Sequence, residues 1–207
     1  MSEAHRVPVI GLCGGVGAGK TEVARLLAEL GCVVVNSDEL AREALRDPAV
    51  IATLRRWWGD GVLDPAGAVD RSKVAAIVFN DPAERRRLEG LTHPWIERRR
   101  RAIFDAAPRG TKALVIDAPL LLEVGLDREC DAVIFVEADQ AARLARVRQS
   151  RGWDERELNR REAAQLPLDE KRRRADDIIV NTGDLNSLCE QVRRVFEQIL
   201  LRHHSRG

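Results

Sequence analysis

A glycine-rich segment near the start of the chain has the residue types needed to bind phosphate. Residues 14–21 read Gly-Gly-Val-Gly-Ala-Gly-Lys-Thr and fit the pattern G-x-x-x-x-G-K-[ST]. Glycines let successive backbone N–H groups turn toward phosphate oxygens with no Cβ in the way. Lys20 can reach the β- and γ-phosphates of a nucleotide, and the Thr21 hydroxyl can bind Mg²⁺. The segment therefore predicts a site for Mg·ATP or a similar nucleotide.

The surroundings of this segment support the same interpretation. An apolar, strand-like run over residues 7–12 precedes it, and a helical pattern over residues 20–30 follows. The positive end of that helix would point at the bound anion. A glycine-rich turn that matches by chance is the alternative, and the strand–loop–helix order argues against it.

Two acids follow apolar runs and could act on a second substrate or on a metal ion. Asp38 comes just after the run 32–36, where a carboxylate can orient a hydroxyl and accept its proton. It could instead cap a helix, although Asn36 and Ser37 are also competent caps. Asp117 ends the run 113–117 and could hold Mg²⁺ through water, or could be a turn or helix cap.

Other polar residues give weaker signals. Glu123 could face an acceptor or could be an acid at a helix start. Pro94 disfavours helix at the residue before it, so we expect His93 at a helix break from which it projects into a cleft. An Arg-rich segment follows the fourth apolar run, and one or two of its arginines could stabilise a transferring phosphoryl group. The arginines in question are Arg143, Arg146, Arg148, Arg151, Arg160 and Arg161.

The elements that would position these residues alternate between strand and helix. Apolar runs at 7–12, 32–36, 113–117, 132–136 and 178–180 are typical of strands covered on both faces, as in a parallel sheet. Helical patterns lie between them, which predicts an α/β fold with a five-stranded parallel sheet of the P-loop NTPase type. We expect one unit with a nucleotide-binding core at 1–36, 112–137 and 177–207, a helical acceptor-binding insertion at 37–111, and a helical lid at 138–176.

Composition excludes several other classes of protein. With 207 residues, a net charge of +1 and 32% charged residues, the chain shows no sign of binding nucleic acid. No apolar run is long enough to span a membrane, and four scattered cysteines suit a reducing compartment. We therefore expect a cytoplasmic protein that binds small molecules, as a monomer or a weak homo-oligomer.

Several separate stretches resemble the dephospho-CoA kinase family, the kinases of the last step of coenzyme A biosynthesis. The opening loop is similar to that family's, and 36–42 resembles its D-A-D-x-x-A-R segment. Residues 91–94 resemble (I/L)-x-H-P, and 117–123 resemble D-x-P-L-L-F-E. Residues 165–176 with 181–183 resemble Q-x-P-x-x-E-K-x-x-x-A-D and N-x-G. The matches run in order along nearly the whole chain.

The resemblance implies a role for each matched residue. Asp38 would be the base on the ribose 3′-hydroxyl of dephospho-CoA, with Lys20 and Arg146 stabilising charge on the transferring group. Arg42, His93, Asp117, Glu123 and Arg161 would lie near the acceptor, and Thr21 with Asp117 would hold Mg²⁺. The implied ATP contacts are Gly14, Gly15, Val16, Gly17, Ala18, Gly19, Lys20, Thr21, Glu22, Arg146 and Asn181.

The chain departs from the family pattern in two places. Asn36 replaces the first acid of D-A-D, and one extra residue separates Arg146 from Arg151. Two other functions remain open at this point, a kinase acting on a nucleoside monophosphate or another small metabolite, and a non-catalytic ATP-binding regulatory protein. The stretch 165–176 argues against the first alternative, and the intact Lys20, Thr21 and Asp38 argue against the second.

Overall fold

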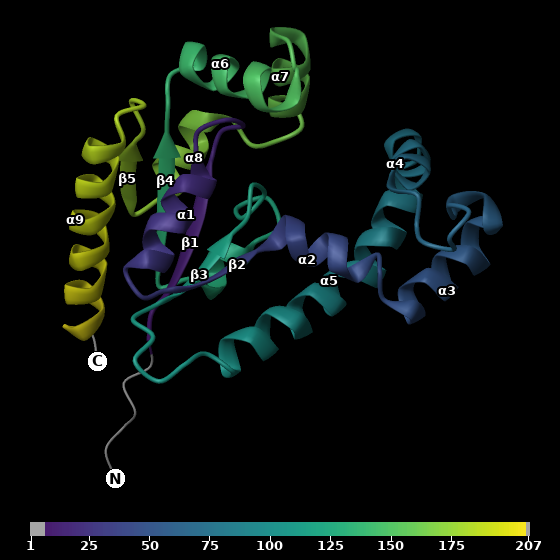
Figure 1. Cartoon of the computed structure of the whole chain (residues 1–207), viewed down its shortest axis with the longest axis horizontal. Coiled ribbons are helices and arrows are strands. Elements are labelled where there is room, and N and C mark those ends of the chain that lie inside the picture. The colour runs from purple at the N-terminus through teal and green to yellow at the C-terminus, as the bar shows by residue number, and fades with distance from the viewer. Residues whose placement is uncertain (1–6, 206–207) are drawn as a thin grey trace. The chain divides into compact units, whose positions relative to one another are not determined.

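A five-stranded sheet forms the centre of the first of two units into which the chain divides (Figure 1). The computed structural model describes residues 7–205, and the first unit takes residues up to 35 together with those from 107 onward. The strands lie in the order β2-β3-β1-β4-β5. They are β1 (Val9–Gly14), β2 (Val33–Asn36), β3 (Leu114–Asp117), β4 (Ala132–Glu137) and β5 (Asp177–Val180).

The strand predictions are confirmed to within two residues at each end, and the fold is the predicted α/β fold with a parallel sheet. The largest difference is at β1, which begins at Val9 and runs on to Gly14. Gly14 pairs with Val136 of the parallel neighbour β4, so the ladder continues up to the phosphate-binding segment. The segment therefore leaves the sheet directly, with no intervening loop.

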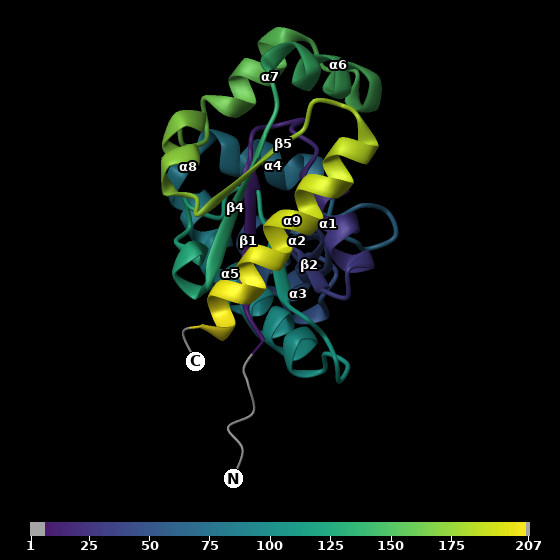
Figure 2. The same ribbon diagram turned by 90° about the vertical axis from the view of Figure 1, so that its left-hand side faces the viewer.

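Helices cover the sheet of the first unit, and α1 and α9 lie together on one face (Figure 2). Buried strand residues such as Leu12, Val115 and Ile134 pack there against Leu27 of α1 and Phe196 of α9. Helix α8 also contacts β1 and β4, and this packing of helices on the strands fits the continuous apolar runs. The helices are α1 (Lys20–Glu29), η2 (Leu126–Glu129), α6 (Gln140–Arg151), α7 (Glu155–Glu162), α8 (Leu168–Arg174) and α9 (Leu185–His204).

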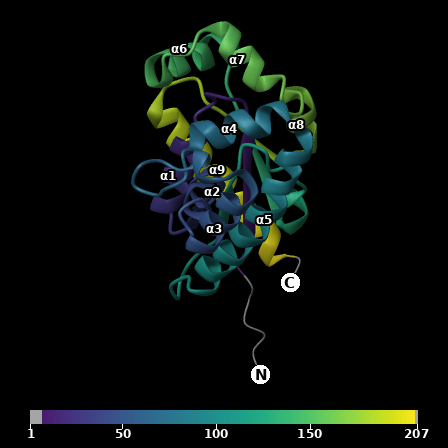
Figure 3. The same cartoon turned by 90° about the vertical axis from the view of Figure 1, so that its right-hand side faces the viewer.

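The second unit, Asn36–Ala106, is helical and has its own core (Figure 3). Val50, Leu54, Val62 and Val74 are buried at its centre. An aspartate caps each of three helices, which fixes their starts. The helices are α2 (Ser37–Ala44), α3 (Pro48–Trp58), η1 (Asp60–Val62), α4 (Arg71–Asn80) and α5 (Pro82–Asp105).

The predicted helix break at His93 is wrong. Helix α5 runs without interruption from Pro82 to Asp105 and includes Pro94. A proline inside a helix removes one hydrogen bond, here the one to the carbonyl of Gly90. Gly90 is exposed, so water can satisfy that carbonyl, and helices tolerate proline when the freed group is solvated. His93 is therefore an exposed residue within a helix.

The remaining general expectations concern membranes and cysteines. Among residues 7–205, no helix is both long and apolar enough to cross a membrane. Cys13 and Cys32 are buried in the first unit, and burial raises the pKa of their thiols to about 11 and about 12. Both are therefore small core residues that remain protonated at neutral pH.

Candidate active site

The phosphate-binding segment links the end of β1 to the start of α1, and two of its glycines are required by close contacts. Gly14 has a φ of 147°, and a Cβ there would lie 2.5 Å from the carbonyl oxygen of Val136. Gly19 has a φ of 94°, and its Cβ would lie 2.2 Å from Nδ2 of Asn181. Both conformations favour glycine strongly. The pattern of glycines thus reflects backbone that passes closely against β4 and the end of β5.

Lys20 and Thr21 occupy the first turn of α1. Nζ of Lys20 donates to the carbonyl oxygens of Gly14 and Gly15, at 3.2 and 3.3 Å, so the ammonium group lies across the loop. Thr21 is exposed at the positive end of the helix. Glu22 points along the helix instead, where an ion pair and hydrogen bond with Arg25 lower the pKa of its carboxyl. The arrangement offers a cation, a hydroxyl and a helix terminus to an anion.

Asp117 ends β3 beside this segment. It lies in register with Leu12 of β1, and the carboxyl ends of parallel neighbours meet at the same sheet edge. Its side chain is buried, with 4% of the residue exposed. A carboxylate and a hydroxyl are the hard oxygen donors that Mg²⁺ prefers, so Asp117 and Thr21 are chemically suited to that ion.

Arg146 and Asn181 brace the phosphate-binding segment from two other elements. Arg146 of α6 donates to the carbonyl oxygens of Gly17 and Ala18, both at 3.2 Å, and to Oδ1 of Asn181 at 3.0 Å. Nδ2 of Asn181 donates to the carbonyl of Ala18 at 3.0 Å. Both side chains therefore contact the loop backbone. Their predicted contacts with ATP stay predictions.

Arg161, which like Arg146 comes from the Arg-rich segment and was given a role, lies on the surface of α7. Its guanidinium stands 4.9 Å from the ring centre of Trp153 and donates to Glu157 at 2.8 Å. Glu157 also pairs with Arg160, and the two arginines lower the pKa of this carboxyl to about 2. Arg161 is thus held against an aromatic ring at the surface, and its contact with the acceptor remains untested.

Glu123 belongs to a buried cluster around Lys171. The Lys171 side chain is fully buried, and its three protons have three acceptors within 2.9 Å, from Glu123, Pro119 and Gln165. The same Glu123 oxygen accepts from the backbone amide of Leu166 at 2.9 Å. No helix begins at Glu123, which lies in a turn, so the helix-start alternative is wrong. The cluster joins the turn after β3 to the chain that follows α7.

The acceptor candidates Asp38, Arg42 and His93 belong to the second unit, and all three are exposed. Asn36 is the N-cap of α2, where its side-chain oxygen accepts from the amide of Glu39 at 3.1 Å. Asp38 is therefore not the cap, which answers the question that the sequence left open. Asn36 and an aspartate are equally good caps, so the departure from the family pattern does not disturb the helix start.

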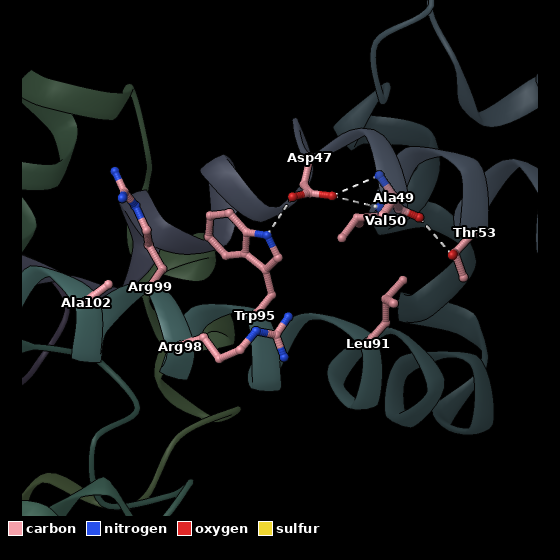
Figure 4. A pocket seen from close by; sticks show the side chains of 9 residues that line it. All are labelled: Asp47, Ala49, Val50, Thr53, Leu91, Trp95, Arg98, Arg99 and Ala102. Atoms are coloured by element: carbon pink, nitrogen blue, oxygen red, sulfur yellow. Dashed lines mark hydrogen bonds between the residues drawn. The ribbon is translucent and has the colours of Figure 1, made fainter.

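A pocket of 540 Å³ lies within the second unit (Figure 4). Nε1 of Trp95 donates to Asp47 at 2.8 Å, and this bond with the amide of Ala49 lowers the pKa of that carboxyl. Leu91 and Trp95 of α5 face the pocket. His93 follows Leu91 by two residues, about 200° around the helix axis, so it lies on the other side of α5. The pocket and His93 do not form one site.

No individual role follows from the sequence alone for Arg143, Glu162 or Lys171. Arg143 and Lys171 are buried, and Glu162 is half-buried. Arg143 pairs with Glu162 beside Gly15, and Lys171 anchors the cluster described above. Lys171 lies in the stretch that resembles the family's Q-x-P-x-x-E-K, which was the available signal. Nothing in the spacing of Arg143 and Glu162 indicates that they meet.

Comparison with known proteins identifies the family. The family model described as dephospho-CoA kinase matches residues 8–187. The chain belongs to the dephospho-CoA kinase family. A dephospho-CoA kinase from Corynebacterium glutamicum is 38% identical over 196 residues, covering 93% of this chain and 98% of that one. The predicted family and the predicted class of enzyme, a kinase, are confirmed.

Solved structures share the fold of this chain. The crystal structure of TT1252 from Thermus thermophilus is 32% identical and superposes with a TM-score of 0.81, covering 93% of this chain and 98% of that one. A dephospho-CoA kinase from Campylobacter jejuni has a TM-score of 0.62 at 21% identity, with 93% and 97% of the two chains covered. The second likeness supports the fold.

Proposed function

We propose that this chain transfers the γ-phosphoryl group of Mg·ATP to the ribose 3′-hydroxyl of dephospho-CoA, giving coenzyme A and ADP. The observation that carries the proposal is the match to the dephospho-CoA kinase family over residues 8–187. A phosphate-binding segment with Lys20 and Thr21 in its first helical turn supports the same chemistry.

The first unit would bind the nucleotide. Amides of the segment and the α1 terminus would hold the phosphates, and Lys20 would move from its carbonyl partners to the β- and γ-phosphates. Thr21 and Asp117 would hold Mg²⁺, which neutralises phosphate charge when bound. Arg146, already against the loop, would add positive charge where the transferring group passes.

The second unit would supply the acceptor side. Asp38 would orient the 3′-hydroxyl and accept its proton, for which an exposed carboxylate with no capping role is available. Arg42 and His93 would contact the acceptor, and Arg161 would approach it from α7. Glu123 already has Lys171 as its partner, so we assign it the role of holding the turn after β3 near the acceptor. We expect the enzyme to work in the cytoplasm, as a monomer or a weak homo-oligomer.

A comparison of acceptors tests this function. ADP release from Mg·ATP is measured with dephospho-CoA, and in parallel with AMP, CMP, pantetheine phosphate and no acceptor. Turnover with dephospho-CoA alone is the expected result. Turnover with one of the other acceptors would keep the kinase chemistry and reject the substrate. ATP binding with no turnover on any of them would favour a non-catalytic nucleotide-binding protein.

A further inference from the structure

A buried ion pair connects α6 with the end of α7. Nη1 of Arg143 contacts Oε1 of Glu162, and the two side chains are 7% and 20% exposed. Nε of Arg143 also donates to the carbonyl of Ala138 at 3.2 Å, which fixes the orientation of the guanidinium. The surface pairs of α7, such as Arg160 with Glu157, are far more exposed on the arginine side. Water therefore screens the Arg143–Glu162 pair less than it screens those pairs.

Both charged ends of this pair lie against the phosphate-binding segment at Gly15. A Cβ on Gly15 would be 3.1 Å from Nη1 of Arg143 and 3.3 Å from Oε1 of Glu162. The backbone of Arg143 also passes Gly17 closely, with its carbonyl oxygen 2.8 Å from where a Cβ would stand. A change in charge on either side chain therefore changes the electrostatic potential at the loop amides over a short distance.

Lys20, whose Nζ donates to the carbonyl of Gly15 at 3.3 Å, keeps its charge in any variant of the pair. The other charged groups near Gly15 are more exposed. A cavity of 170 Å³ beside the pair is lined by Gly15 and Arg143 and also by Glu137, Asp169 and Arg172. Arg172 pairs with Glu137 at 3.3 Å, and more than a third of each of these two side chains is exposed. Asp169 is exposed as well. Solvent weakens their field, so the buried pair has the stronger influence on the segment.

We propose that Arg143 and Glu162 set the balance of charge at the Gly15 end of the phosphate-binding segment and thereby the affinity for ATP. This inference rests on the proposed function in one respect, that the phosphates of ATP bind at the segment. Glu162 alone would place a carboxylate beside those phosphates and repel them, and Arg143 cancels that charge. Neither residue touches the reacting atoms, so neither is a catalytic residue.

Two single variants test the proposal, because both break the same ion pair but leave opposite charges. Arg143→Gln leaves the Glu162 carboxylate uncompensated and is expected to raise KM for ATP about three- to tenfold. Glu162→Gln leaves the guanidinium uncompensated and is expected to lower KM by a similar factor. The double variant, which is neutral like the wild type, is expected to return KM to near the wild-type value.

A purely structural role gives a different pattern. If the pair only holds α7 in place, both single variants raise KM, and that outcome would overturn the proposal. If Arg143→Gln does not fold, Glu162→Gln alone is decisive, because the proposal predicts a lower KM for ATP and a structural role predicts a higher one. Arg101→Gln and Glu97→Gln are the matched controls, because they break an exposed pair on α5 and are expected to leave KM for ATP unchanged.

The same variants separate this inference from the proposed function. ATP affinity is measured by calorimetry as well as in the kinase assay, so a wrong acceptor does not affect the result. Opposite shifts in ATP affinity without turnover of dephospho-CoA would reject the function and keep the inference. Normal turnover of dephospho-CoA, with ATP affinity shifted in the same direction in both single variants, would support the proposed function and reject the inference.

Discussion

The phosphate-binding segment and the acceptor candidates of the second unit differ in how their polar groups are held. Around the segment, Arg143, Asn181 and Asp117 are buried, and Arg143 and Asn181 contact the segment itself. In the second unit, Asp38 and His93 are exposed on helices whose starts are fixed by other residues. The polar groups of the first region contact other parts of the protein, and the candidate groups of the second region are exposed to solvent.

This difference fits the two tasks of a kinase, which are to bind the nucleotide phosphates and to activate the acceptor hydroxyl. Phosphates need amides and cations in a fixed geometry before they bind, because little reorganisation is then required during transfer. A base on the acceptor side needs only to reach one hydroxyl when the acceptor is bound. We therefore expect changes near the segment to affect ATP binding and catalysis together, and changes at Asp38 to affect catalysis alone.

The largest effect is expected for Lys20→Ala, which removes the cation that lies across the segment. Turnover should fall about a thousandfold or more, because the transferring phosphoryl group loses a charge that stabilises it. The measurement is steady-state ADP release with saturating dephospho-CoA. Lys112→Ala is a suitable control because Lys112 is an exposed lysine of the same unit. A Lys20 variant with near wild-type kcat would show that phosphoryl transfer does not occur at the segment.

A smaller effect is expected from a pair of glycine substitutions that compares the two regions directly. Gly19 and Gly67 have similar backbone, with φ of 94° and 80°, but only Gly19 has neighbours that a Cβ would strike. Gly67→Ala should cost about 1 kcal/mol of stability from strain alone and leave kinetics unchanged. Gly19→Ala should lower kcat/KM for ATP about a hundredfold, because it displaces the segment or Asn181.

Thermal unfolding and ATP kinetics of both glycine variants provide the measurement. Equal losses of kcat/KM in the two variants would contradict the view that the segment depends on close packing and the second unit does not. Equal losses of stability in the two variants, with no change in the kinetics of either variant, would contradict that view as well.

Much of the fold can be predicted from the sequence because its signals are local. Continuous apolar runs mark strands that are buried in the sheet, and the five runs coincide with β1 to β5 to within two residues. The break predicted at His93 is wrong, because α5 continues through Pro94. That error came from applying the rule for proline without knowing that the freed carbonyl of Gly90 is solvated.

The site is predicted less completely because its contacts are tertiary. The loop residues follow from the motif, and Asp117 follows from its position at a strand end. The loop connects β1 to α1, and Asp117 ends β3, which pairs with β1. The partners of Arg143 and Arg146 do not follow, since one pairs with a residue 19 positions away and the other with Asn181, 35 positions away. Six arginines in one stretch look alike until the fold separates buried from exposed ones.

The Asp38→Asn variant tests the division of work between the two regions most directly, with kcat and ATP affinity measured side by side. The account predicts that kcat falls about a hundredfold or more, because the base is lost, while the Kd for ATP by calorimetry stays within about twofold of wild type. Glu39→Gln, an exposed acid in the same turn of α2, is the control and should change neither quantity. A near-normal kcat in Asp38→Asn, or a large loss of ATP affinity, would contradict the account.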